Sequence, residues 1–241
     1  MKKHLIVFLA YQHLDIVSKS FESINQVDSD IFIVENKSEN SGQISQYFQD
    51  KNHKGYIQFH ENVANSSMTI FIRDFWQLIS SYEYVTFTDG DLFVYDVNEM
   101  FSEIFDAFKN PNVLISSAEL WQGNHYLNEH RLGFDDFIND CKNSKEPFGS
   151  ITGNTGNFFV TIKNENLNIL LDSKLYLDSY LAETVNKRNG YWYKVNQNKV
   201  YHLTWDLYYD GNPYFEFKKE VYNKIWFVPH NAGYETLKCE F

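Results

Sequence analysis

The chain has 241 residues, of which 43% are hydrophobic, and its 32 acidic and 21 basic residues give a formal net charge of -11 at pH 7. This composition excludes an intrinsically disordered chain and suffices for one large domain, or for a domain with a smaller subdomain. The acidic balance argues against nucleic acid as a partner, because binding to a phosphate backbone requires a basic surface.

The start of the chain predicts a buried strand rather than a targeting segment. Two lysines precede a short apolar run in "MKKHLIVFLAY", but polar "QHLD" follows and no small-residue cleavage site appears. No apolar run reaches the roughly 18 residues of a membrane span. Cys141 and Cys239 match neither a zinc spacing nor a disulfide framework. We therefore expect a protein of the reducing cytoplasm.

The first ninety residues alternate between strand patterns and helix patterns. Apolar or aromatic runs typical of strands occur at residues 4–11, 30–38, 56–62 and 82–89. Between them, apolar residues recur at helical spacing at residues 14–24 and 68–79, and residues 41–50 can also be helical. This alternation predicts an α/β fold with a mostly parallel central sheet that is covered by helices on both faces.

Polar side chains close each of the predicted strands. They are Gln12 and His13, Glu35 and Asn36, Glu61 and Asn62, and Asp89 and Asp91. In parallel α/β sheets the ligand crevice lies beyond the carboxyl ends of the strands, so these side chains are expected at one edge. A crevice lined by carboxylates and amides suits a ribose, a base edge and a metal ion better than an apolar ligand.

The stretch "TFTDGDLFVY", residues 86–95, admits two interpretations. Asp-Gly between alternating apolar residues is a strong signal for a β-hairpin turn. Alternatively, two carboxylates at the end of a parallel strand can share a divalent cation with a diphosphate, because hard cations take oxygen ligands and keep positions for phosphates. The two interpretations are compatible, since a sharp glycine turn can present both carboxylates.

Several segments in chain order carry a resemblance to a known family. They are "FIVENKSENSG", "ENVANSS", "FTDGD", "ITGNTGNFFVTIK" (151–163), "LYLDSYLAETVNKRNGY" and "VYHLTW". In this order the chain resembles the glycosyltransferases of the GT-A fold, most closely the bacterial enzymes of family 2. The resemblance implies a single Rossmann-like GT-A domain over residues 1–241, an α/β/α sandwich with a donor-binding half at 1–110 and an acceptor-binding half at 111–241.

The resemblance also implies roles for individual residues. Those implied to bind the nucleotide are Glu35, Asn36, Asn62, Asp89 and Gly90. Those implied to hold Mn²⁺ or Mg²⁺ are Asp91, Asp89 and His202, although a lone strand histidine is as readily a core or surface residue. Asp178 matches the position of the catalytic base in relatives, and Glu183 is the alternative.

The implied activity is metal-dependent, inverting transfer of a sugar from a UDP-sugar to a glycan or lipid-linked glycan acceptor. In bacterial relatives this activity serves the biosynthesis of surface polysaccharides. The resemblance also implies a cytoplasmic enzyme, with peripheral contact at the inner face of the membrane as an option. One alternative is a non-catalytic sugar- or nucleotide-binding protein of the same fold. Another is a haloacid-dehalogenase-like phosphohydrolase, in which Gly-Thr follows the two aspartates on the first strand; here Leu92 and Phe93 follow, and three strands precede.

Other polar and aromatic residues have both a structural and a functional interpretation. Arg73 and Asp74 form either a helix pair or a brace for the nucleotide site, and the structural role is favoured. Trp121, Trp192 and Trp205 either stack on sugar rings or, with greater weight, fill the core. The sequence contains no dinucleotide fingerprint, P-loop or G-x-S-x-G motif, which removes three common alternatives.

Overall fold

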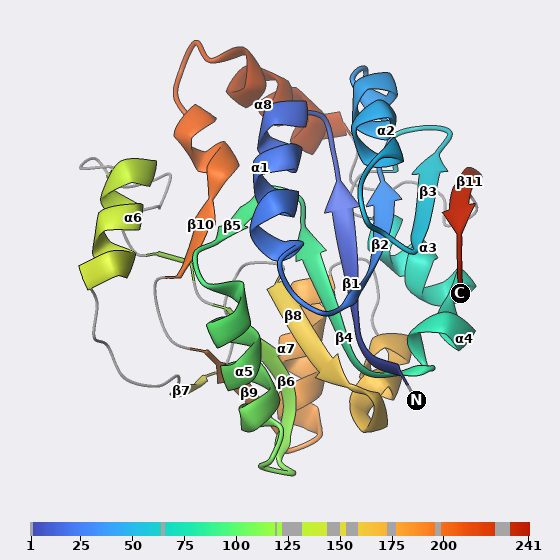
Figure 1. The fold of residues 1–241 in the computed structure, drawn as a ribbon, viewed down its shortest axis with the longest axis vertical. Coiled ribbons are helices and arrows are strands. Elements are labelled where there is room, and N and C mark those ends of the chain that lie inside the picture. Colours follow the sequence, from blue (N-terminus) through green and yellow to red (C-terminus); the bar gives the residue numbers. More distant parts are fainter. Residues whose placement is uncertain are drawn as a thin grey trace.

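The computed structural model describes residues 2–63, 66–118, 120–121, 132–143, 150–152, 159–172, 177–195, 199–224 and 232–241. The strands of its main sheet are β1 (Lys2–Ala10), β2 (Asp30–Glu35), β3 (Gly55–Phe59), β4 (Tyr82–Asp89), β6 (Val113–Ser117), β7 (Ser150–Thr152), β8 (Phe159–Lys163), β9 (Tyr191–Lys194) and β11 (Tyr234–Cys239). In the described ranges they form one nine-stranded sheet in the order β11-β3-β2-β1-β4-β8-β6-β9-β7 (Figure 1).

The main sheet is mostly parallel, as the sequence predicts. Strands β3, β2, β1 and β4 are parallel neighbours, and β6 is parallel to β9. Three strands, β8, β7 and β11, run antiparallel to their neighbours. The four predicted strands are confirmed. Each of the predicted polar closing residues is either the last residue of its strand or lies just after it. Strands from the second half of the chain extend the sheet of the first half.

Helices cover both faces of the main sheet (Figure 1). The described helices are α1 (Leu14–Ile24), α2 (Ser41–Gln49), α3 (Ser67–Asp74), α4 (Trp76–Ile79), α5 (Val97–Ala107), α6 (Phe134–Asn143), α7 (Leu177–Lys187), α8 (Pro213–Lys224) and the 3-10 helices Asn164–Asp172 and Leu203–Leu207. The predicted helix 68–79 is divided at Phe75 into α3 and α4. None of the described helices is long and apolar enough to cross a membrane.

The core explains why the first strand is continuously apolar from Leu5 to Ala10. Ile6 and Phe8 of β1 pack in one cluster with residues of α1, α2 and α5. Leu5 and Val7, on the opposite face, pack with residues of α3, α7 and the 3-10 helix Asn164–Asp172. Because successive side chains of a strand point to opposite faces, a strand with helices on both sides needs apolar residues at every position.

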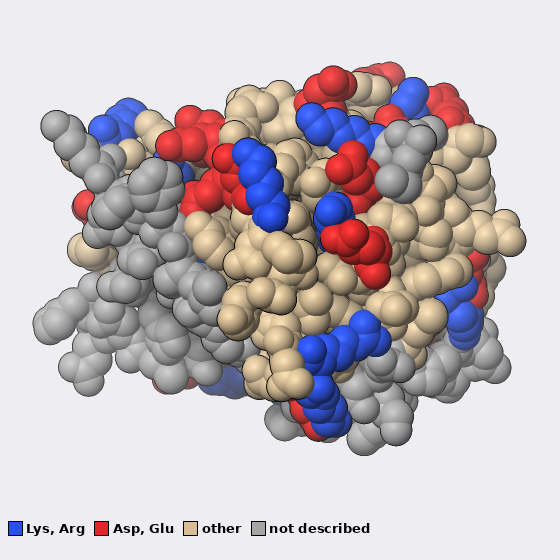
Figure 2. Space-filling view, turned by 90° about the horizontal axis from the view of Figure 1, so that it is seen from below, with Lys and Arg blue, Asp and Glu red and all other residues tan. Residues whose placement is uncertain are grey.

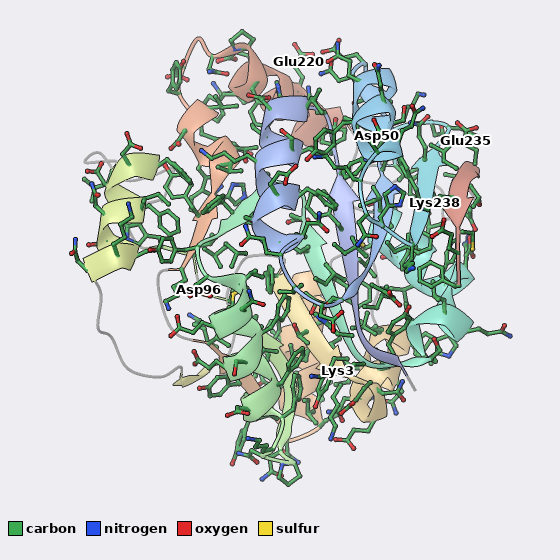
Figure 3. The ribbon with its side chains drawn as sticks, in the orientation of Figure 1. Lys3, Asp50, Asp96, Glu220, Glu235 and Lys238 are labelled. Carbon is green, nitrogen blue, oxygen red and sulfur yellow. The ribbon has the colours of Figure 1, made fainter. Side chains whose placement is uncertain are left out.

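The last described strand, β11, was not predicted from the sequence. It lies at the edge of the main sheet beside β3, and Phe241 beyond it stacks on Phe32 with ring centroids 5.6 Å apart. Glu235 and Lys238 project from this edge strand (Figure 3). Charged side chains on an edge strand disfavour pairing with another chain, so they protect this edge of the sheet from the addition of a further strand.

The face at the amino ends of the strands has mixed charge. Figure 2 shows this face, where Lys and Arg side chains lie among Asp and Glu side chains on a surface of mainly uncharged residues. Interspersed charges of both signs are usual for a solvent-facing surface. The opposite edge, where the parallel strands end, carries the candidate site.

Candidate functional site

The register of the parallel strands brings their closing residues to one edge. Asp89 pairs with Leu9 at the end of β1, Ala10 pairs with Glu35 of β2, and Glu35 pairs with Gln58 of β3. These strands therefore end level with one another, at the upper edge of the sheet in Figure 1. The prediction that their polar closing residues share one edge is confirmed.

The Asp89-Gly90-Asp91 turn leads from the main sheet into a second one. Strand β5 (Leu92–Val94) does not pair with β4; it pairs antiparallel with β10 (Val200–His202) in a separate two-stranded sheet. The hairpin interpretation is therefore wrong in its pairing, although a sharp turn is present. Local sequence signals a turn at Asp-Gly but does not specify which strand the following residues will meet.

Gly90 is required because the turn passes directly over β1. A Cβ atom at this position would lie 2.2 Å from the backbone carbonyl oxygen of Leu9. Real Cβ atoms do not approach backbone this closely, and the carbonyl of a central strand cannot withdraw. Gly90 thus allows the turn between Asp89 and Asp91 to pass close against Leu9 near the carboxyl end of β1.

We expect Gly90→Ala to lower the free energy of unfolding by about 1–3 kcal/mol, because the added methyl overpacks against the Leu9 carbonyl. Gly42→Ala is the matched control. Gly42 lies in α2 with open space around its Cα, so alanine there should stabilise by about 0.5–1 kcal/mol. Urea denaturation of both variants measures the difference, and equal effects would contradict the role of the close approach.

Asp91 lies beside His202 in the folded chain, although the two are far apart in sequence. The distance from Asp91 Oδ2 to His202 Nε2 is 3.8 Å, and Thr204 Oγ1 donates a hydrogen bond of 2.9 Å to the same Oδ2. Asp91 Oδ1 is buried and has no hydrogen-bond partner. Pairing of β5 with β10 produces this neighbourhood, and Leu203 N donates to Asp91 O at 2.8 Å.

Asp89 is half-buried at the end of β4, two residues from Asp91. The described residues include no group of three or more His, Cys, Asp or Glu side chains placed to hold a metal ion. The structure thus brings together Asp91 and His202 of the predicted ligands, and the metal role of Asp89 stays a prediction. Two protein ligands suffice where substrate phosphates and water complete the coordination of a hard cation.

Glu35, the predicted nucleoside contact, is fully buried at the end of β2. Its Oε2 accepts hydrogen bonds from the Tyr56 hydroxyl and from Gln58 Nε2 at 2.8 Å, whereas its Oε1 is buried without a partner. Lys37 Nζ donates to Gln58 Oε1 at 3.3 Å and so orients the Gln58 amide. Burial raises the pKa of Glu35 above its ordinary value, although hydrogen bonds to the carboxylate oppose this shift.

Asn36 and Asn62 connect the loops that follow β2 and β3. Asn36 Nδ2 donates to Asn62 Oδ1 at 3.0 Å, and Asn62 Nδ2 donates to the Tyr11 hydroxyl at 2.9 Å. Asn36 Oδ1 accepts from the Val63 backbone N–H at 2.8 Å. These bonds hold the ends of β1, β2 and β3 in fixed relative positions. A direct contact of either asparagine with a nucleotide stays a prediction.

Gln12 carries backbone strain at the end of β1. Its φ of 67° lies in the left-handed region, which is uncommon for a residue other than glycine. The side chain is buried, and its Oε1 has no hydrogen-bond partner. Strained backbone of this kind collects at functional sites, and Gln12 joins Glu35 and Asp91 as a residue whose side chain has a buried, unsatisfied oxygen at this edge.

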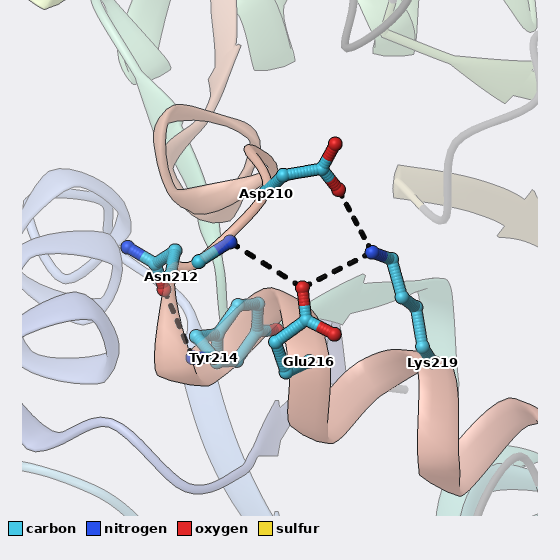
Figure 4. Close-up of polar contacts among 6 residues, drawn as sticks. Asp210, Asn212, Tyr214, Glu216 and Lys219 are labelled. Carbon is cyan, nitrogen blue, oxygen red and sulfur yellow. Dashed lines mark hydrogen bonds and ion pairs between the residues drawn. The ribbon is translucent and has the colours of Figure 1, made fainter.

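Helix α8 begins beside the loop that follows β1. Asn212 Oδ1 caps the helix by accepting from the Tyr214 backbone N–H at 2.9 Å, and Glu216 pairs with Lys219 at 3.1 Å (Figure 4). The ring of Tyr214 contacts His13 edge-on, with centroids 4.8 Å apart. The start of α8 thereby contributes a wall to the carboxyl edge that the sequence did not predict.

The predicted catalytic segment is described only in part. Asp178 lies in the first turn of α7, but its side chain is outside the described residues. Glu183, the alternative base on the same helix, forms an exposed ion pair with Lys187 at 2.6 Å. Residues 153–158 of the predicted donor floor also lie outside the described residues, whereas β8 is present next to β4.

The tryptophans have mainly structural surroundings. Trp121 is buried and donates to Asp140 at 2.9 Å, and Trp192 is buried and donates to Ser117 at 2.7 Å. These contacts confirm the core interpretation for both. Trp205 instead stacks on the His202 ring, with centroids 4.6 Å apart.

Arg73 Nε donates to the Asp74 carboxylate at 2.5 Å on α3, which agrees with the favoured structural pair. Neither Cys141 nor Cys239 forms a disulfide with another cysteine in the described part of the chain. The site residues that sequence analysis missed are Tyr56, Gln58 and Thr204. Of these, only Thr204 lies in a segment that carries the family resemblance, "VYHLTW", and no local sequence feature marks it as a site residue.

Comparison with known sequences finds relatives of unknown activity. Uncharacterized proteins L142, L138 and L137 of Acanthamoeba polyphaga mimivirus are 28%, 30% and 30% identical over 97%, 95% and 90% of this chain. The chain spans about half the length of the first relative, at 49%, and 28% and 32% of the others. No family model matches the chain, so membership of family 2 stays a prediction.

Solved structures establish the fold type. A protein of Desulfovibrio desulfuricans G20, provisionally assigned as a nucleotide-diphospho-sugar transferase, matches with a TM-score of 0.50 and 8% identity, over 93% of this chain and 97% of that one. S. aureus TarS 1–349 matches with a TM-score of 0.52 and 12% identity, over 84% of this chain and 60% of that one. The chain therefore has an α/β fold of the GT-A type.

Proposed function

We propose that this protein is a metal-dependent glycosyltransferase that moves a sugar from a nucleotide-sugar, with UDP as the expected nucleotide, to a glycan or lipid-linked glycan. The observation that carries this proposal is the Asp91–His202 pair at the carboxyl edge of a GT-A type sheet, with Asp91 Oδ1 buried and unpartnered. The resemblance of the D-x-D segment supports the same reaction, and bacterial surface polysaccharide is the acceptor class that it suggests.

The donor atoms at this edge fit Mn²⁺ or Mg²⁺. A buried carboxylate oxygen without a hydrogen-bond partner is costly, and a bound cation would satisfy it. The carboxylate of Asp91 is the kind of oxygen ligand that suits Mg²⁺ and Mn²⁺, and the imidazole of His202 would add a nitrogen ligand of the kind that transition metals accept. The acidic net charge of the chain does not oppose an anionic donor here, since a bound cation reverses the local sign.

The roles of the chain's own residues follow from their positions. When bound, the cation would stabilise the negative charge that grows on the leaving diphosphate. Asp91 and His202 would hold it, and the close approach of Gly90 to Leu9 fixes the course of the turn that leads to Asp91. Glu35 at the end of β2, whose buried Oε1 has no hydrogen-bond partner, is the residue that we propose for the nucleoside contact.

Transfer with inversion requires a base for the proton of the acceptor hydroxyl. Asp178 at the start of α7 is the residue proposed for this role, by its match to the family motif. Glu183 is less suitable, because its carboxylate is already paired with Lys187 on the exposed side of the same helix. A positioned base contributes typically about 100-fold to 10,000-fold to the rate.

Calorimetric titration with UDP, GDP and CMP, each with Mn²⁺ and with a chelator, tests the proposal. We expect UDP to bind in the presence of Mn²⁺ and binding to vanish on chelation. Absence of binding for every nucleotide under both conditions would remove the main support for the enzyme. Hydrolysis assays separate the alternatives: a phosphohydrolase would release phosphate from substrates without a nucleotide, and a binding protein would turn over neither kind of substrate.

A further inference from the structure

Thr204 connects the two proposed metal ligands through its hydroxyl group. Its Oγ1 lies 2.9 Å from Asp91 Oδ2 and also 2.9 Å from His202 Nδ1. The residue is only 3% exposed, so water competes weakly for these bonds. A single buried hydroxyl therefore bridges the carboxylate and the imidazole.

The number of available protons determines which group donates in each of these two hydrogen bonds. A carboxylate only accepts hydrogen bonds, and a threonine hydroxyl has one proton to donate. Thr204 donates that proton to Asp91, so its oxygen must accept from His202 Nδ1. The neutral imidazole then carries its proton on Nδ1 and its lone pair on Nε2.

The rest of the segment holds the ring in place. Trp205 stacks on the His202 imidazole with an interplanar angle of 15°, which restricts rotation of the ring. His202 lies opposite Leu92 in the β5–β10 pair, so the backbone on both sides of the cluster is tied together. The tautomer is thus imposed on a ring that has little freedom to turn away.

We propose that Thr204 is a positioning residue that holds His202 in the tautomer able to bind a divalent cation through Nε2, together with Asp91. This inference rests on the proposed metal-dependent function. The separation of 3.8 Å between His202 Nε2 and Asp91 Oδ2 is too long for a direct hydrogen bond. This separation is within the reach of a cation shared by the imidazole and the Asp91 carboxylate, because two ligand bonds of about 2.0–2.2 Å span at most roughly 4.3 Å.

The tautomer is measurable in the metal-free protein. Two-bond ¹H–¹⁵N correlation spectra of ¹⁵N-histidine-labelled protein distinguish a protonated from an unprotonated ring nitrogen, and His202→Gln assigns the signal. We expect His202 to carry its proton on Nδ1. A signal from the Nε2–H tautomer would overturn the inference without any use of metal or substrate.

Variants of Thr204 test the link to metal binding, with Mn²⁺ alone as the probe. Thr204→Val keeps the shape but removes the hydroxyl, and we expect Mn²⁺ affinity to fall about 10-fold to 100-fold, as for other groups that orient metal ligands. Thr204→Ser keeps the hydroxyl and should retain affinity and tautomer. Should Thr204→Val fail to fold, Thr204→Ser and the wild-type tautomer remain decisive.

The outcomes separate this inference from the proposed function. Equal Mn²⁺ affinity in wild type and folded Thr204→Val would overturn the positioning role and leave the proposed function standing. A wild-type protein that binds no Mn²⁺, with or without UDP, would overturn both. Loss of affinity in Thr204→Val with rescue in Thr204→Ser, together with the Nδ1–H tautomer, supports the inference.

Discussion

Asp91→Asn should abolish metal-dependent binding of UDP while leaving the fold intact. The substitution removes the negative charge that we assign to the cation, but the carboxamide oxygen of the new side chain can still accept the hydrogen bond from Thr204. We expect the loss to exceed the roughly 10-fold to 100-fold typical of residues that only orient a ligand. Calorimetry with UDP and Mn²⁺ measures the binding, and circular dichroism checks the fold.

Asp106→Asn is the matched control for this experiment. Asp106 lies on α5 with its side chain 65% exposed in an ion pair with Lys109, so the variant makes the same charge change far from the carboxyl edge. It should bind UDP and Mn²⁺ as the wild type does. Unchanged binding by Asp91→Asn would show that Asp91 is not a metal ligand and would return the Asp-Gly-Asp segment to a purely structural turn.

Asp178→Asn should leave donor binding unchanged and slow sugar transfer about 100-fold to 10,000-fold. The variant keeps the size of the side chain but cannot take up the proton of the acceptor hydroxyl, which is the contribution of a general base. Single-turnover transfer from the UDP-sugar that the calorimetric screen identifies measures the rate. The separation of binding from rate identifies a chemical role and not a structural one.

Glu183→Gln provides the comparison within the same helix. Its carboxylate pairs with Lys187 at the surface of α7, and exposed helix pairs contribute only a few tenths of a kcal/mol. We expect near-normal transfer and near-normal stability from this variant. A large loss with Glu183→Gln and a small one with Asp178→Asn would exchange their roles, and a small effect of both would place the base elsewhere or indicate a retaining reaction.

Much of the fold was predictable because its signals are local. Continuous apolar runs such as residues 4–11 belong to strands buried on both faces, and helical apolar spacing such as that of residues 14–24 marks the covering helices. The sequence does not predict β11, because polar and apolar residues alternate only weakly along it and four of its six residues are exposed in the fold. An edge strand has little apolar periodicity to reveal it.

The candidate site was predictable where it depends on strand ends and not where it depends on pairing. Glu35 and Asp89 follow from the rule that parallel strands present their carboxyl ends together. The sequence does not identify Tyr56 and Gln58 as site residues, because they lie within a strand. Their contact with Glu35 arises from the register of β2 and β3. The sequence is compatible with Trp205 as a core residue or as a platform for a sugar ring, whereas in the structure its ring stacks on His202.

The sequence by itself determined the α/β class, the order of the first strands and helices, and the identity of the polar residues that close them, since each depends on periodicity over a few neighbouring positions. The tertiary structure decided that Asp91 meets His202 and Thr204. That meeting requires β5 to leave the main sheet and pair with β10, a contact between segments that are distant in sequence. Packing and long-range hydrogen bonding select such a contact, and no local pattern encodes it.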